Sequence, residues 1–163
     1  MGIVLGRVGL MGSPLWAESE TSQAIRAQFS AGGRPLHMML WISSSGIIEG
    51  HCGGHVLKRR IRGSYRAGED LRVRVGGSVF GDTLYLDLRN STRIVGTIGG
   101  RFMGCGLKAE VYDHCITAWI QDRGIHRERF EMELADMEPG VALMMGVIAC
   151  YHSYFVYPDP AWS

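Results

Sequence analysis

Two clusters of cysteine and histidine carry the side chains best suited to chemistry in this sequence. The first, His51-Cys52-Gly53-Gly54-His55, brings a thiol close to two imidazoles, which are ligands that zinc prefers. The residues around it alternate with period two, so Cys52 falls on the apolar face of a strand and His51 on the opposite face. Ligands on opposite faces do not converge on one ion. We therefore interpret Cys52 as a core residue and predict no metal site.

The second cluster, Asp113-His114-Cys115, has the residue types of an activated thiol, but it falls in a polar turn with no third partner in the pattern. The glycines Gly6, Gly9 and Gly12 lack the GxGxxG order of a dinucleotide-binding loop, and no GxSxG, HExxH or GK[ST] motif occurs. From these patterns we predict no catalytic residue, no cofactor and no enzyme activity.

A run of cations is the one candidate binding site. Residues 58–74 contain seven lysines and arginines against Glu69 and Asp70, in a chain whose total charge is +1. Guanidinium groups suit bidentate recognition of phosphate, so this run predicts a site for an anionic ligand. Nucleic acid is disfavoured because the total charge is near zero and no aromatic residue interrupts the basic run Lys58-Arg59-Arg60-Ile61-Arg62. The predicted site consists of Lys58, Arg59, Arg60, Arg62, Arg66, Arg72 and Arg74.

The strand pattern places three of these cations together. Arg72 and Arg74 share one outward face, and Arg62 has the outward register of the preceding strand. An alternative interpretation is that the arginines pair across strands with carboxylates such as Glu49 and Asp87 and only keep the surface soluble.

The elements that position these residues follow from the glycines, which number 23 among 163 residues. Three glycine pairs recur at intervals of 23 residues: Gly53-Gly54, Gly76-Gly77 and Gly99-Gly100. A fourth pair, Gly32-Gly33, lies 21 residues before the first of these three. Each pair separates two runs with period-two alternation, which is typical of a β-hairpin. This internal repeat predicts about ten to twelve antiparallel strands over residues 1–136.

Alternation within the runs indicates which face is buried. Leu84, Leu86 and Leu88 point one way, while Tyr85 and Asp87 point the other. Single glycines inside or beside the second strand of a unit predict bulges or bends that curve the sheet. These are Gly63, Gly81, Gly104 and Gly106.

A hydrophobic segment follows the strands. Residues 138–157 predict a helix, with Asp136 or Glu138 as its N-cap and Pro139 in the first turn, before a short tail at 158–163. Three arrangements compete: a membrane tail anchor over residues 141–157, a helix on the outside of an open sheet, and a helix inside a closed barrel. The last fits best, because a helix that is apolar on all sides must be buried all round and about twelve strands leave a lumen of helix width.

The strand pairs from Ile25 to Leu134, followed by the hydrophobic segment from Pro139 to Phe155, resemble the tubby C-terminal-like barrels. This group includes the tubby domain, the phospholipid scramblases and the plant LURP-one-related proteins. The resemblance is architectural, and it implies a twelve-stranded barrel that encloses a hydrophobic C-terminal helix. For the basic run it implies binding of phosphoinositide headgroups, as in tubby domains.

Taken together, these observations predict one all-β domain over residues 1–163: a repeat-built antiparallel barrel of about twelve strands around a C-terminal helix. Four cysteines without CxxC spacing and the lack of a signal-peptide pattern favour the cytoplasm, with peripheral contact to a membrane. The expected function is a non-catalytic binding or scaffold module for anionic phospholipid headgroups or a protein partner. The alternative is a membrane-associated lipid-handling protein with residues 141–157 as its anchor.

Overall fold

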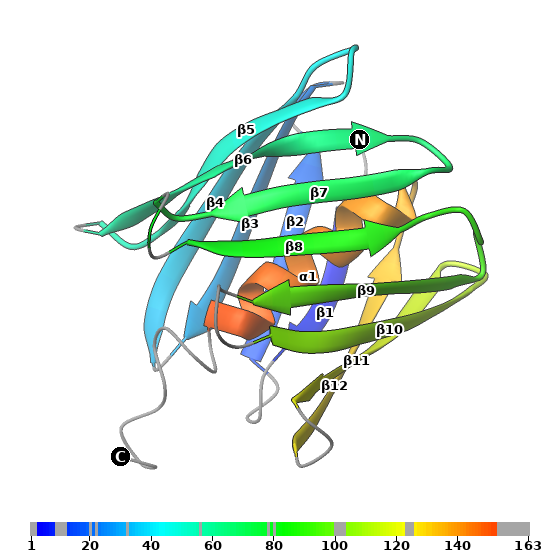
Figure 1. Ribbon diagram of the computed structural model, residues 1–163. Helices are drawn as coiled ribbons and strands as arrows, with labels where there is room; N and C mark the ends of the chain where they lie inside the picture. The colour runs from blue at the N-terminus through cyan, green and yellow to red at the C-terminus, as the bar shows by residue number, and fades with distance from the viewer. Residues whose placement is uncertain are drawn as a thin grey trace.

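Twelve β-strands and one α-helix make up the part of the chain described by the computed structural model, which comprises residues 3–8, 13–19, 21, 23–31, 33–55, 57–77, 79, 81–99, 104–122 and 126–152. The strands are β1 (Ile3–Val8), β2 (Ser13–Ser19), β3 (Ala24–Ala31), β4 (Arg34–Ile42), β5 (Ile47–Gly53), β6 (Lys58–Arg66), β7 (Asp70–Val75), β8 (Asp82–Asp87), β9 (Arg93–Gly99), β10 (Gly104–Tyr112), β11 (Cys115–Asp122) and β12 (His126–Leu134). Helix α1 (Pro139–Tyr151) follows β12 (Figure 1).

Each strand pairs antiparallel with its neighbours in the sequence, and β1 pairs with β12 as well as with β2. The hydrogen-bonded order is β1-β12-β11-β10-β9-β8-β7-β6-β5-β4-β3-β2, which is the order of a closed barrel. Successive connections therefore alternate between the two ends of the sheet. The predicted antiparallel sheet with one C-terminal helix is confirmed.

Period-two alternation decides which side chains form the core. In β7, Leu71, Val73 and Val75 are at most 2% exposed, whereas Arg72 between them is exposed. The same alternation buries Leu84 in β8. Burial of one face of each strand removes apolar area from water, which is the main favourable contribution to folding of such a sheet.

Helix α1 begins as the sequence predicts. Glu138 is the N-cap: its carboxylate accepts a hydrogen bond of 2.9 Å from the backbone N–H of Val141, and Pro139 occupies the first turn. Every residue from 140 to 150 is buried, so the helix has no polar face. Residues 153–157 of the predicted helix lie outside the described residues.

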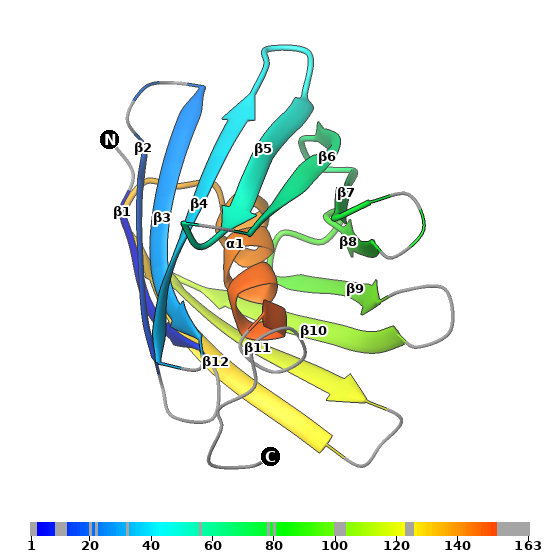
Figure 2. The same cartoon turned by 90° about the vertical axis from the view of Figure 1, so that its left-hand side faces the viewer.

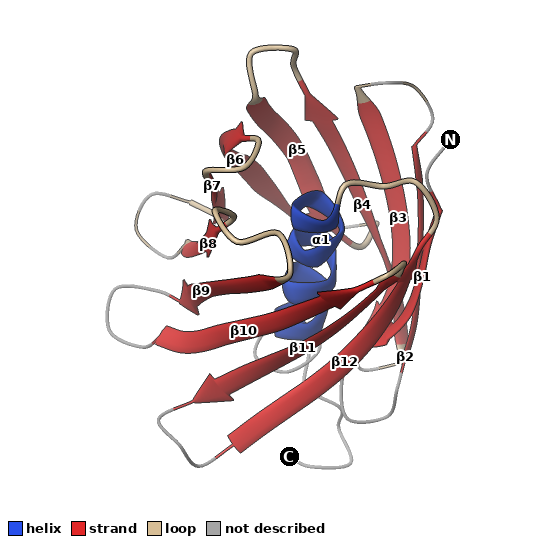
Figure 3. Ribbon diagram, turned by 90° about the vertical axis from the view of Figure 1, so that its right-hand side faces the viewer, coloured by secondary structure: helices blue, strands red, loops and turns tan. Residues whose placement is uncertain are grey.

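The helix packs against strands from distant parts of the sheet. It contacts β1, β3, β8, β11 and β12, and Figures 2 and 3 show it lying among these strands. Gly146 permits a close approach to β12, because a Cβ atom there would come within 2.7 Å of both Met132 and Phe130. The helix thus fills space that the strands' own side chains leave open.

The paired glycines lie where the strands turn. Gly53 ends β5 and Gly54 follows it, while Gly76 and Gly77 lie between β7 and β8. Gly99 ends β9, and its predicted partner Gly100 lies outside the described residues. The hairpin prediction is therefore confirmed at the first two pairs.

Candidate functional site

A groove along β6 and β7 brings together five of the seven cations that the sequence singled out. Its volume is about 700 Å³, and we call it the basic groove. Among the described residues that line it there is no carboxylate. The lining residues are Lys58, Arg59, Arg60, Arg62, Arg74, Gly76 and Gly77.

Strand register places the cations side by side. Lys58, Arg60 and Arg62 are the exposed, alternate residues of β6. Arg62 lies directly opposite Arg74 in the antiparallel β6–β7 pair, and directly opposed residues have Cα atoms about 4.5–5.5 Å apart. Two guanidinium groups on adjacent strands can therefore reach one anion from two sides.

The turn after β7 shapes one end of the groove. The Gly76 N–H donates a hydrogen bond of 2.8 Å to the carbonyl oxygen of Arg60, although β7 has ended at Val75. Gly76 has φ of 100°, and a Cβ atom there would lie 2.7 Å from Nη2 of Arg59. Both the left-handed backbone and the close guanidinium therefore require glycine at this position.

Cross-strand pairing with carboxylates, the alternative interpretation of the basic run, does not account for the groove. Glu49 lies opposite Arg62 in the β5–β6 pair, yet no ion pair joins the two. Asp87 is bound by Arg89 through a hydrogen bond of 2.9 Å, which holds the pKa of Asp87 at about 2. In the part of the chain that the structure describes, Lys58, Arg60 and Arg62 have no carboxylate partner, so their charges face the solvent.

The two remaining cations of the predicted set lie outside the groove. The Arg66 guanidinium makes two hydrogen bonds of 2.8 Å to Asp70 and an ion pair of 3.0 Å to Glu69. The hydrogen bond from Arg66 is the main reason that the pKa of Asp70 is lowered. Arg72 lies over the ring of Tyr85, 5.4 Å from its centroid, as a cation–π contact. The guanidinium groups of these two arginines are therefore engaged by other side chains on the surface of the sheet.

Arg59 has a second role that the sequence analysis missed. It shares the register of buried Ile61, and its Nη2 donates hydrogen bonds to the Asp82 carboxylate at 3.1 Å and to the Val75 carbonyl at 3.3 Å. The same carboxylate accepts a hydrogen bond of 2.8 Å from the Tyr151 hydroxyl. This Arg59–Asp82–Tyr151 cluster fixes the last turn of α1 to β6 and β8. The period-two alternation of β6 by itself places Arg59 on the inner face with Ile61, opposite to the outward-facing Lys58 and Arg60.

Burial, followed by the hydrogen bond to Asp82, raises the pKa of Tyr151. The tyrosine therefore stays protonated and acts as a hydrogen-bond donor. The cluster is thus suited to fastening the helix, and its carboxylate is already occupied by two donors.

His152 lies next to the Arg59–Asp82–Tyr151 cluster. From its burial we predict that the free energy of unfolding depends on pH. Its ring is 1% exposed, and Nδ1 donates a hydrogen bond of 2.9 Å to the Ile148 carbonyl. Burial, with a smaller contribution from the Arg59 charge, lowers its pKa from 6.5 to about 4, while the Ile148 hydrogen bond and Asp82 act in the opposite direction. Between these two values the unfolded chain binds a proton that the folded chain does not, so stability falls as the pH falls below about 6.5.

We expect the free energy of unfolding, measured with urea, to fall by about 1–3 kcal/mol between pH 7 and pH 4.5 through this residue. In His152→Leu this part of the decrease should disappear. Exposed His114 provides the control, because His114→Leu should keep the wild-type dependence. Equal slopes for all three proteins would contradict the assignment.

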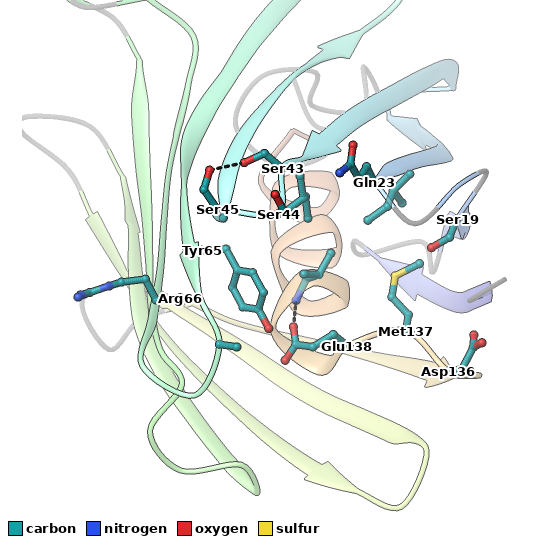
Figure 4. A pocket seen from close by; sticks show the side chains of 15 residues that line it. Ser19, Gln23, Ser43, Ser44, Ser45, Tyr65, Arg66, Asp136, Met137 and Glu138 are labelled. Carbon is teal, nitrogen blue, oxygen red and sulfur yellow. Dashed lines mark hydrogen bonds between the residues drawn. The ribbon is translucent and has the colours of Figure 1, made fainter.

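A second cavity of about 640 Å³ lies at the first turn of α1, at the other end of the helix from Tyr151 and His152 (Figure 4). In it the Tyr65 side chain points toward Glu138, the helix N-cap. Burial, the charge of Glu138 and a hydrogen bond to it raise the pKa of Tyr65 to about 12. The Ser43 hydroxyl accepts a hydrogen bond of 3.0 Å from the Ile47 N–H within the β4–β5 turn. The polar groups of this cavity thus hold the helix start and a turn.

The strand pattern places Cys52 correctly on the buried face of β5, whereas Cys115 of the second cluster lies in β11 and not in the predicted turn. Cys52 is fully buried, and burial raises the pKa of its thiol to about 12, which keeps it protonated. His51 lies on the other face of β5, beside Trp41 at 6.2 Å between ring centroids. Asp113 and His114 form the turn before β11, whose first residue is Cys115. Over the described ranges, no group of three histidine, cysteine or carboxylate side chains is arranged to hold a metal ion.

Comparison with known proteins gives no relative: no family model, no curated protein and no solved structure matches this chain. The resemblance to tubby-like barrels therefore stays a prediction. Within the described residues, no helix combines the length and the hydropathy that a membrane span requires.

Proposed function

We propose that this protein is a non-catalytic binding module, a β-barrel with α1 as its core, whose basic groove binds phosphate groups of an anionic ligand. One observation carries the proposal: Lys58, Arg60 and Arg62 are exposed along the groove, and within the described residues none of the three has a carboxylate partner. A concentration of exposed positive charge costs free energy through mutual repulsion, and a bound anion removes this cost.

The chemistry of the lining favours phosphate over a single carboxylate. Arg62 and Arg74 approach from adjacent strands, and Lys58 and Arg60 extend the positive charge along β6. Planar guanidinium groups offer paired N–H donors that match phosphate oxygens, and lysine adds a compact charge. A ligand with two or more phosphates would use the whole length of the groove.

The structure's cavities support binding in preference to catalysis. Glu138 and Tyr65 are engaged with the start of α1, and Asp82 and Tyr151 are engaged with its end. Residues 140–150 are buried against the strands, which favours the barrel module over a lipid-handling protein with a tail anchor.

The test replaces exposed cations of the groove. In Arg60→Glu/Arg62→Glu we expect the affinity for inositol hexakisphosphate, measured by isothermal titration calorimetry, to fall at least about tenfold, since a hydrogen bond to a charged group contributes about 1.5–3 kcal/mol. Arg60→Lys/Arg62→Lys should lose less, because the charge remains.

Arg34→Glu is the matched control, because Arg34 is an exposed arginine on β4 outside the groove. It should bind as the wild type does. Wild-type protein that does not bind the probe, or equal losses in the groove variant and in Arg34→Glu, would disprove the proposal.

A further inference from the structure

An exposed tryptophan lies two strands away from the cations of β6. The Trp41 side chain on β4 is 47% exposed, and its ring lies beside that of His51 on β5, with 6.2 Å between the ring centroids. His51 in turn lies directly opposite Arg60, a cation of the basic groove, in the β5–β6 pair. The folded sheet, in which β4, β5 and β6 are neighbours (Figure 2), therefore brings an aromatic surface to a basic run that contains no aromatic residue of its own.

A carboxylate lies between the tryptophan and the arginines. Glu49 is exposed on β5, directly opposite Trp41 on one side and directly opposite Arg62 on the other. In the described part of the chain it forms no ion pair with Arg62, so its oxygens can accept hydrogen bonds from a ligand. A carboxylate beside a phosphate site suits a ligand that carries hydroxyl groups as well as phosphates.

We propose that the ligand of the basic groove is a nucleoside di- or triphosphate. Its base stacks on Trp41 beside His51, its ribose hydroxyls donate hydrogen bonds to Glu49, and its phosphates bind the exposed cations of the groove. The inference rests on the proposed function and deepens it by naming the class of ligand. We call Trp41, Glu49, His51 and the basic groove together the nucleotide site.

The order of the side chains across the sheet matches the order of the groups in such a ligand. Base, ribose and phosphates follow one another in a nucleotide, and Trp41, Glu49 and Arg62 follow one another across β4, β5 and β6. Neighbouring strands lie about 4.7–4.9 Å apart, so these three strands span about 10 Å. Carboxylates bind ribose hydroxyls in dinucleotide-binding folds. Bases of every kind stack on an aromatic ring, because each has a π-face.

A single nucleotide fits the nucleotide site better than a nucleic-acid strand does. Proteins that bind single strands present several aromatic side chains on which successive bases stack. Of the tryptophans that the structure describes, Trp41 is exposed, whereas Trp16 and Trp119 are half-buried. Trp119 also lies on β11, five strands from β6, where Lys108 contacts its ring at 5.6 Å from the centroid. The site therefore offers one exposed tryptophan and one phosphate groove, which are the needs of one nucleotide.

The experiment compares ATP with inorganic tripolyphosphate by isothermal titration calorimetry. Tripolyphosphate has the same chain of three phosphates without base or ribose. Wild-type protein should bind ATP at least about tenfold more tightly, because stacking of the base adds to the phosphate contacts. Trp41→Ala should abolish most of this difference and leave the affinity for tripolyphosphate unchanged, whereas Trp41→Phe should keep much of it. Trp119→Ala is the matched control and should bind both probes as the wild type does.

Glu49→Gln tests the ribose contact separately. Loss of the negative charge beside the groove should strengthen the binding of tripolyphosphate, because the carboxylate repels phosphate. ATP gains the same relief but loses a charged acceptor for its ribose hydroxyls, and hydrogen bonds to charged groups are about twice as strong as neutral ones. The ratio of the two affinities should therefore fall at least about threefold. An unchanged ratio would contradict the ribose contact.

Binding of inositol hexakisphosphate separates this inference from the proposed function, because that probe has phosphates but no base. Trp41→Ala should bind it as the wild type does. If the wild type binds inositol hexakisphosphate but prefers ATP no more than tripolyphosphate, or if Trp41→Ala binds ATP as well as Trp119→Ala, the nucleotide proposal is overturned and the phosphate groove remains. If the wild type fails to bind inositol hexakisphosphate, the proposed function itself is wrong. Binding of a single-stranded oligonucleotide without binding of ATP would assign the surface to nucleic acid and also overturn the nucleotide proposal.

Discussion

Replacement of Val147 by aspartate should prevent the chain from folding. Val147 is 0% exposed and lies in the middle of the eleven consecutive buried residues of α1. A carboxylate there would lose its hydration without gaining a charged partner, and a buried unpaired charge costs about 4 kcal/mol or more. This cost approaches the whole stability of a typical domain, about 5–15 kcal/mol.

Val95→Asp is the matched control for this change, because it introduces the same carboxylate at a residue that is 46% exposed. We expect it to shift the free energy of unfolding by about 0.5 kcal/mol or less. The measurement is thermal unfolding followed by circular dichroism, with size-exclusion chromatography to detect aggregated protein. Equal melting temperatures for the two variants would mean that α1 is not part of the core.

Gly96→Ala should be among the most damaging single-methyl changes in the sheet. Gly96 pairs with Leu86 across β8 and β9, and a Cβ atom there would overlap the carbonyl oxygen of Tyr85. The obstacle is backbone held by the ladder on both sides, so it cannot move away as the end of a side chain could. We expect a loss of about 3 kcal/mol or failure to fold.

Gly106→Ala tests whether the effect is specific to close approach. Gly106 lies in the neighbouring strand β10, and the nearest atom to an added Cβ is the Gln121 carbonyl oxygen at 3.9 Å. Its stability to urea should stay within about 1 kcal/mol of the wild type. If Gly96→Ala proved as stable to urea as Gly106→Ala, the curvature of β9 would not depend on glycine.

This contrast also qualifies the sequence analysis of the single glycines. Gly63 resembles Gly96, because an added Cβ would overlap the Arg72 carbonyl, whereas added Cβ atoms at Gly104 and Gly106 would make only ordinary van der Waals contacts. Composition and periodicity cannot separate these two kinds of glycine, since the difference depends on how closely the neighbouring strand approaches.

Much of the candidate site follows from local pattern. Period two assigned Arg62, Arg72 and Arg74 to the outer face, and the burial of each strand agrees with this assignment. Two features required the folded chain: Arg72 and Arg66 are occupied by Tyr85 and by Asp70, and the inward-facing Arg59 pairs with Asp82. Such partners are chosen by cross-strand register.

The sequence by itself therefore determined the antiparallel strands, the first two Gly-Gly turns and the capped start of α1, because each depends on residues close together in the chain. Only the tertiary structure decided that β1 pairs with β12, that Tyr151 bonds to Asp82, and that Arg60, Arg62 and Arg74 line one groove. These features join residues far apart in sequence. Their positions are set by how the sheet curves and how α1 packs, which local propensity does not encode.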